Sequence, residues 1–262
     1  QYSKRDKNEP LLQFKRCLAH FCIDNNKASM TTKLAGENTF FLPYNKGIEN
    51  PSTDGYRSEY MWKEVLEKDS ILDIVENFAH LSKEKEYNFN EKTKSVEAKT
   101  KEILIFPRYH QLELNRKFKK SIIKNGVGTN YLVQHTTGSG KSYSIGWLSH
   151  LLTSLYKDPS DKNRMFNSIV VVTDRTVLDE QLKNTIRSLQ KVDGVVYGAE
   201  KSSELKEYLE KGKDIIITTI QKFPFISDTI ASLKDKNFAV IIDEVHSSQS
   251  GELSKELKKT LK

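Results

Sequence analysis

The sequence has little cysteine and no long apolar run, and both absences argue against whole classes of protein. Its 262 residues include two cysteines, Cys17 and Cys22, too few for a small secreted domain held together by disulfides. No stretch is apolar over the ~20 residues that a membrane helix needs, and the first residues do not form a signal peptide. We expect a cytoplasmic protein without a membrane partner and with buried, free thiols. Because the first residue is not Met, we also expect a fragment of a longer chain.

Metal-ligand patterns are also scarce. Five of the six histidines have no ligand partner at metal-binding spacing, and we expect these five to be structural: His20, His80, His110, His135 and His150. His246 differs because of the acidic residues that precede it.

Basic residues are in excess, and they are unevenly distributed. Residues 1–100 carry 16 Lys and Arg and 16 Asp and Glu, so the whole net charge of +7 lies in residues 101–262. A positive field attracts polyanions, and nucleic acid is the natural candidate. The alternative is a composition that is merely rich in lysine.

A glycine-containing run lies between an apolar segment and an amphipathic one. Residues 130–134 predict a strand, residues 135–142 have the sequence HTTGSGKS, and residues 142–156 predict a helix. Glycines let backbone N–H groups approach phosphate oxygens, Lys141 can reach the β- and γ-phosphates, and the Ser142 hydroxyl can ligate Mg²⁺. His135 replaces the first glycine of the usual pattern. The alternative is an ordinary glycine turn before a helix.

A second run places two carboxylates directly after an apolar strand predicted at residues 238–242. Asp243 is suited to hold the Mg²⁺ shell, and Glu244 to orient the attacking water. Alone, the pair could be an acidic turn after a strand. With the glycine run upstream, it predicts an ATP·Mg²⁺ site.

The order of elements predicts two domains. Before residue 82 we expect a helix at 11–21, strands at 30–34 and 39–44, and one or two helices at 60–81. The charged residues 82–101 predict a linker or an exposed excursion, so we expect domains at 1–95 and 96–262. Further strands at 168–173 and 214–218, with helices at 176–189 and 202–210, predict an α/β three-layer sandwich with a mainly parallel sheet. A smaller α+β segment would precede it.

Polar residues follow two of the predicted strands. Thr173 and Arg175 end one, and Thr219 and Gln221 follow another, where hydroxyls and amides suit phosphate contacts that are independent of sequence. The alternative is helix capping. Gln111 opens the second domain and could hydrogen-bond adenine, although a Gln at a helix start is common.

Taken in order, the motifs PRYHQ, HTTGSGKS, VVTDRTVLDEQL, TTIQKF and IIDEVHSSQ resemble the motor lobes of superfamily 2 helicases. They are most similar to the motor subunit of type I restriction enzymes, the HsdR family. NEPLLQFKRCLAHF and MTTKLAGENTFFLPYNKG resemble the segment that joins nuclease and motor in that family. The resemblance implies a RecA-like P-loop lobe preceded by the end of a nuclease domain.

This resemblance also implies roles for individual residues. Gln111 would bind adenine, Lys141 and Glu244 would act in hydrolysis, and His246 would couple hydrolysis to DNA. The phosphates would lie on Thr137, Gly138, Ser139, Gly140, Lys141 and Ser142, with Mg²⁺ on Ser142 and Asp243. DNA would lie on Thr173, Arg175, Thr219 and Gln221.

The resemblance implies partners as well: double-stranded DNA and the methyltransferase and specificity subunits of the complex. Nuclease residues would precede residue 1, and a second lobe with the arginine finger would follow residue 262. The isolated piece should therefore bind ATP·Mg²⁺ weakly and hydrolyse it slowly. The alternatives are one lobe of a stand-alone helicase or remodeller, and a nucleotide-binding switch that does not hydrolyse ATP.

Overall fold

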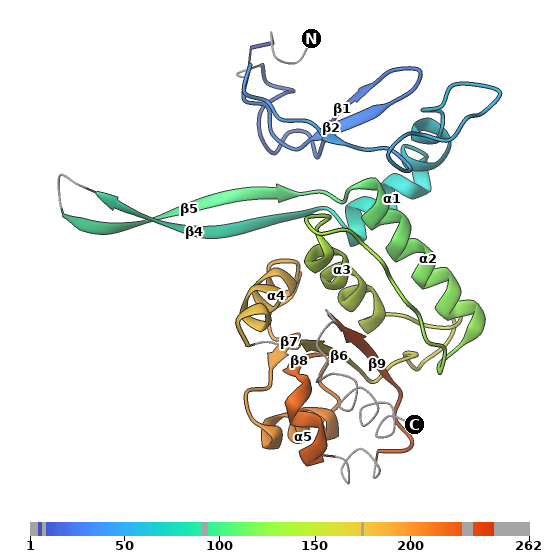
Figure 1. The fold of residues 1–262 in the computed structure, drawn as a ribbon, viewed down its shortest axis with the longest axis vertical. Helices are drawn as coiled ribbons and strands as arrows, with labels where there is room; N and C mark the ends of the chain where they lie inside the picture. Colours follow the sequence, from blue (N-terminus) through green and yellow to red (C-terminus); the bar gives the residue numbers. More distant parts are fainter. Residues whose placement is uncertain (1–4, 7–8, 91–93, 174–175, 227–232, 244–262) are drawn as a thin grey trace. The chain divides into compact units, whose positions relative to one another are not determined.

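The computed structural model describes residues 5–6, 9–90, 94–173, 176–226 and 233–243 (Figure 1). Internal contacts divide the chain into two compact units, Gln1–Leu114 and Asn115–Lys262. The division falls inside helix α2 (Tyr109–Asn125). The functional boundary that we expect near residue 95 stays a prediction.

The first unit contains a small antiparallel sheet of order β1-β2-β3 and two short helical segments. The sheet comprises β1 (His20–Ile23), β2 (Ala28–Thr31) and β3 (Leu42–Pro43), and the helical segments are η2 (Met61–Val65) and α1 (Lys68–Asn77). The strands predicted at 30–34 and 39–44 therefore exist but are shorter. The helical prediction for 60–81 holds as a pair that ends at Asn77, because β4 begins at His80. The break lies at Leu66–Glu67, where the Glu67 side chain caps α1, and not at Asp69–Ser70, where we expect it from the sequence.

The helix predicted at residues 11–21 is wrong. The segment forms turns, and β1 begins within it at His20. Lys15 has a φ of 73°, which no α-helical residue adopts, and its ammonium pairs with the carboxylate of Glu102. Tertiary contacts thus override the apolar spacing of this segment. Both cysteines are free as expected, but they are not buried: Cys22 is exposed and Cys17 is half-buried.

The linker predicted at residues 82–101 is also wrong. The segment forms most of a long antiparallel ribbon, β4 (His80–Asn90) with β5 (Ser95–Ile105), drawn extended in Figure 1. The register places Lys83 opposite Glu102, and oppositely charged cross-strand pairs help to stabilise such a ribbon. A charged strand of this kind lacks the apolar alternation by which a strand is recognised in sequence.

The second unit contains a four-stranded parallel sheet of order β7-β8-β6-β9. Its strands are β6 (Ser168–Thr173), β7 (Val196–Gly198), β8 (Ile215–Thr219) and β9 (Phe238–Ile242), and its helices are α3 (Lys141–Thr153), α4 (Thr176–Ser188), α5 (Ser202–Glu210) and the 3₁₀ segment η3 (Ile220–Ile226). The predicted strands at 168–173 and 238–242 and the helix at 202–210 are confirmed. The strand at 214–218 is confirmed one residue later, and β7 was missed because it is only three residues long.

The strand predicted at residues 130–134 is wrong. These residues belong to no strand, and Leu132 is 96% exposed. Within the described residues β9 is the edge of the sheet and pairs only with β6. An apolar β-type run becomes a strand only where a neighbouring strand satisfies its backbone, and here none does.

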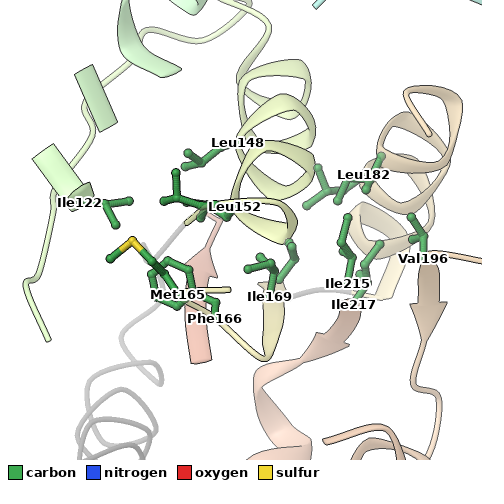
Figure 2. Packing of buried hydrophobic residues seen from close by; sticks show 13 residues of the cluster. Ile122, Leu148, Leu152, Met165, Phe166, Ile169, Leu182, Val196, Ile215 and Ile217 are labelled. Carbon is green, nitrogen blue, oxygen red and sulfur yellow. The ribbon is translucent and has the colours of Figure 1, made fainter. Parts of the chain in front are cut away.

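Two apolar clusters cover the two faces of the sheet. On one face Leu148 and Leu152 of α3 and Leu182 of α4 pack against Ile169 and Ile215 (Figure 2). On the other face α5 and η3 pack against the alternate residues of the same strands, including Val170, Val172 and Ile216. Both β6 and β8 are buried at every position, and their β-branched apolar runs explain why those strands were recognisable in the sequence. The α/β prediction with a parallel sheet is therefore confirmed.

Among the described residues, none of the helices combines the length and the apolarity that crossing a bilayer requires.

Candidate nucleotide site

The glycine run ends directly at the N-terminus of α3. Gly138 has a φ of 76° and Gly140, the residue before the helix, has a φ of 80°. Both values lie in the left-handed region that favours glycine. Gly140 has no side chain to cap the helix, and its carbonyl accepts the Tyr143 and Ser144 N–H groups at 3.1 and 3.3 Å. Lys141 and Ser142 are the first two helical residues, at the positive end of the helix dipole.

The predicted polar strand ends lie in a row on neighbouring strands. Thr173 of β6 pairs in register with Thr219 of β8, and the Asp243 N–H donates to the Val172 carbonyl at 2.9 Å. Because alternate residues share a face, all three lie on the face where Val171, Ile217 and Ile241 pack beneath α3. The structure therefore brings Thr219, Thr173 and Asp243 together at the carboxyl edge of the sheet, on the side that α3 covers.

Close contact between helices holds α3 in place. A Cβ at Gly146 would approach the Leu189 Cδ1 to 2.7 Å, so a side chain here would collide with the end of α4. His150 Nε2 lies 2.9 Å from the Ile186 carbonyl oxygen in the last turn of α4. As predicted, His150 is structural: its ring N–H donates to a carbonyl of the last turn, which also accepts the Leu189 N–H at 3.3 Å.

Gln111 lies in the first turn of α2 and is buried. Its Oε1 accepts a hydrogen bond from the Arg108 N–H at 2.8 Å, which stabilises the start of the helix. This bond occupies the amide oxygen, one of the two groups that adenine recognition would use. Binding of adenine by Gln111 stays a prediction.

An aromatic cluster of the first unit holds the same turn of α2. The Tyr109 ring packs edge-on against Tyr60 and Tyr44, with centroids 5.2 and 5.9 Å away. The Lys46 ammonium lies over both the Tyr60 and Tyr109 rings and pairs with Glu64. Burial, reinforced by the Glu113 and Glu64 charges, strongly raises the pKa of Tyr109, so its hydroxyl stays protonated. The first turn of α2 is thus fixed in the first unit.

The predicted DNA-binding residues differ in accessibility. Thr173 and Thr219 are 2% and 4% exposed, whereas Gln221 is exposed on η3. The Lys222 ammonium donates to the Thr219 Oγ1 at 3.0 Å and is half-buried. Sequence reasoning missed Lys222, although a lysine three residues after a strand-ending threonine was a usable signal. It is a cation at the carboxyl edge of the sheet.

Three predicted residues, Arg175, Glu244 and His246, lie outside the described residues. Within the described part of the chain, no group of three or more His, Cys, Asp and Glu side chains could hold a metal ion. The segment at 130–134 is exposed and pairs with no strand, so the glycine run lacks the strand that we expected before it.

Comparison with known families gives one match in the second half of the chain. Residues 110–262 match the SWI2/SNF2 ATPase family. The match includes the glycine run and the three strand ends, at Thr173, Thr219 and Asp243.

Curated relatives include several subunits of restriction enzymes. The MjaVIIIP type I restriction enzyme endonuclease subunit of Methanocaldococcus jannaschii is 24% identical over 256 residues, 87% of this chain and 23% of that protein. The C-terminal part of the MpnIIP subunit of Mycoplasma pneumoniae is 32% identical over 152 residues, covering 55% of this chain and 66% of that protein. The HindI subunit of Haemophilus influenzae is 35% identical over 123 residues, which cover 45% of this chain and 11% of that protein.

These relatives confirm the resemblance to type I restriction subunits. The chain spans less than a quarter of the two Methanocaldococcus jannaschii proteins that it matches.

Proposed function

Because the chain belongs to the SWI2/SNF2 ATPase family, we propose that it is the first motor lobe of a type I restriction subunit that moves DNA with ATP. The observation that carries the proposal is the position of Asp243 on the sheet face that the glycine-capped α3 covers. In the intact subunit this lobe, with the end of the nuclease domain before it, would drive the translocation that precedes DNA cleavage.

The residues at the start of α3 fit a nucleotide triphosphate. A Cβ at Gly138 would meet no heavy atom within 4 Å, so the loop is open to an incoming ligand. Thr137 to Ser142 would bind the phosphates, with Lys141 as the cation. Ser142 and Asp243 would ligate Mg²⁺, which would supply charge neutralisation at the γ-phosphate. Glu244 would hold the attacking water, and Gln111 would bind adenine. A complete RecA-like P-loop sandwich is part of this proposal.

The DNA would lie along the carboxyl edge of the sheet. Gln221 is exposed there, and Lys222 adds a cation beside Thr219. Thr173 and Arg175 would contribute from the neighbouring strand end, and His246 would couple DNA binding to hydrolysis. Methyltransferase and specificity subunits, rather than this lobe, would recognise the DNA site. A cytoplasmic location fits such a complex.

Hydrolysis of ATP by the full-length protein, with and without duplex DNA, tests the proposal. The unaltered protein should hydrolyse ATP faster when DNA is present. Lys141→Ala should lose both nucleotide binding and hydrolysis, whereas Glu244→Gln should bind ATP normally but lose at least two orders of magnitude in rate, the usual scale for catalytic base removal. Hydrolysis that is indifferent to Glu244→Gln would favour a nucleotide switch. An ATP hydrolysis rate that does not change when DNA is added would contradict the proposed motor function.

A further inference from the structure

The outer face of α2 carries a row of three lysines, Lys117, Lys120 and Lys124. We propose that this row is a second docking surface for the phosphate backbone of duplex DNA, separate from the strand ends. The inference rests on the proposed function, since it presumes that DNA is the polymer on which the protein acts.

The three lysines lie on one face of the helix, opposite its buried side. At about 100° per residue they fall within a sector of roughly 60°. All three are exposed. Phe118 and Ile122, two positions before Lys120 and Lys124, pack into the apolar cluster beneath α3, about 200° away around the helix. The lysine row therefore faces solvent.

Charge is concentrated on this helix. α2 contains five basic residues, Arg116, Lys117, Lys119, Lys120 and Lys124, and a single acidic residue, Glu113. It therefore supplies a net charge of +4 to the +7 excess of residues 101–262. Glu113 lies on the same sector one turn before Lys117, so Lys120 and Lys124 should dominate the attraction.

The spacing of the row suits a nucleic-acid strand. Lys117 and Lys124 are seven residues apart, which spans about 10 Å along a helix axis. One strand of B-DNA carries a charge about every 3.4 Å along its axis, so the row can meet about three successive phosphates. Ammonium groups bind phosphates as point charges and read no base, as a translocating protein requires.

The helix beneath the row is held firmly. The Phe118 and Tyr131 rings pack with centroids 5.0 Å apart. The Asn125 amide donates to the Ser121 hydroxyl, which in turn donates to the Tyr131 hydroxyl, at 3.0 and 3.1 Å. These contacts hold the helix on its inner and lateral sides, beneath three lysines that are exposed.

The salt dependence of DNA binding by the full-length protein tests the proposal. The variant K117Q/K120Q/K124Q is compared with K63Q/K206Q/K211Q, which removes the same charge from exposed lysines that pair with Glu59, Glu210 and Glu207. Affinity for a duplex of mixed sequence is measured by fluorescence anisotropy over a series of NaCl concentrations. Each phosphate contact adds about 0.9 to the slope of log K against log salt concentration.

The α2 variant should lower that slope by about 2 to 3, and the control variant should leave it near that of the unaltered protein. K120E/K124E should weaken binding further at low salt. An unchanged slope in the α2 variant, or an equal loss in the control, would overturn the proposal. A loss of assembly with partner subunits at an unchanged slope would assign the row to an acidic protein surface instead. The proposed function is tested separately, because it requires only that DNA stimulates ATP hydrolysis by the unaltered protein. It can therefore hold whether or not the lysine row binds DNA.

Discussion

Gly138 and Gly140 adopt backbone angles that other residues reach only at a cost of about 1–2 kcal/mol. Crowding does not require a glycine at position 138, because a Cβ there would meet no heavy atom within 4 Å. Backbone conformation, rather than crowding, therefore explains the glycine, and it directs the N–H groups at the start of α3.

Replacing Gly140 with Ala should weaken the binding of ATP to the protein, because the loop must leave its present conformation or carry the strain. Gly36→Ala is a matched control, since Gly36 has a φ of 62° in the first unit. Both variants should lose about 1 kcal/mol of stability, but only Gly140→Ala should lower affinity for a fluorescent ATP analogue. Equal affinities in the two variants would contradict the assignment of the loop.

Burial lowers the pKa of His20 in the first unit below its ordinary value of 6.5. A histidine whose folded-state pKa is depressed stabilises the fold above its unfolded pKa, and that stability is lost as the pH falls through and below 6.5. Amide hydrogen exchange of β1 and β2 should therefore show lower opening free energies at pH 5.5 than at pH 7.5. His20→Gln should flatten this pH dependence, and an equally steep dependence in that variant would exclude His20 as its source.

At the scale of elements, the crossing of α3 and α4 determines where Lys141 lies. Gly146→Val should destabilise the second unit by about 1–3 kcal/mol, because its branched side chain would have to displace Leu189 and approach Ile186. Gly146→Ala should be nearly neutral, since the clash is with the mobile end of a leucine and alanine gains about 1 kcal/mol of helix propensity. Urea unfolding followed by fluorescence of the neighbouring, buried Trp147 measures both, in a Trp62→Phe background.

Equal stability losses in the two Gly146 variants would show that the crossing of α3 and α4 cannot accommodate any Cβ at this position. No loss in either variant would show that the two helices are less closely packed than the structure indicates.

The elements that sequence predicted well are those with buried β-branched runs. β6 and β8 are buried at every position, so their pattern is continuous and typical of a parallel sheet. The ribbon β4–β5 was missed because charged residues such as Lys83 and Glu102, which lie opposite each other in its register, interrupt the apolar alternation typical of a strand. The segment at 130–134 has the same apolar pattern as β9, but a strand also needs a pairing partner, which local sequence does not specify.

The site was predictable where chemistry depends on residue type, and less so where it depends on burial. Gly138, Gly140 and Asp243 are candidates on the basis of their spacing, and Asp243 lies on the sheet face that α3 covers. The burial of Gln111 and its bond to the Arg108 N–H depend on the fold around α2 and were not foreseeable.

At the scale of the whole molecule, the positive charge and the family agree. The excess of +7 lies in residues 101–262, and the SWI2/SNF2 ATPase match covers residues 110–262. A motor that acts on DNA needs both an ATP site and a sequence-independent attraction to phosphate. The second unit supplies candidates for both: the start of α3, and the basic strand edge and α2.

The most direct test of the central claim is ATP-driven movement along DNA by the full-length subunit, together with the methyltransferase and specificity subunits that we propose as its partners. Displacement of a third strand from a duplex, placed at a distance from the recognition site, reports such movement. We predict displacement that requires ATP, and that Glu244→Gln abolishes it while ATP binding remains. Displacement by the Glu244→Gln protein, or ATP hydrolysis without any displacement, would contradict a motor built on this site.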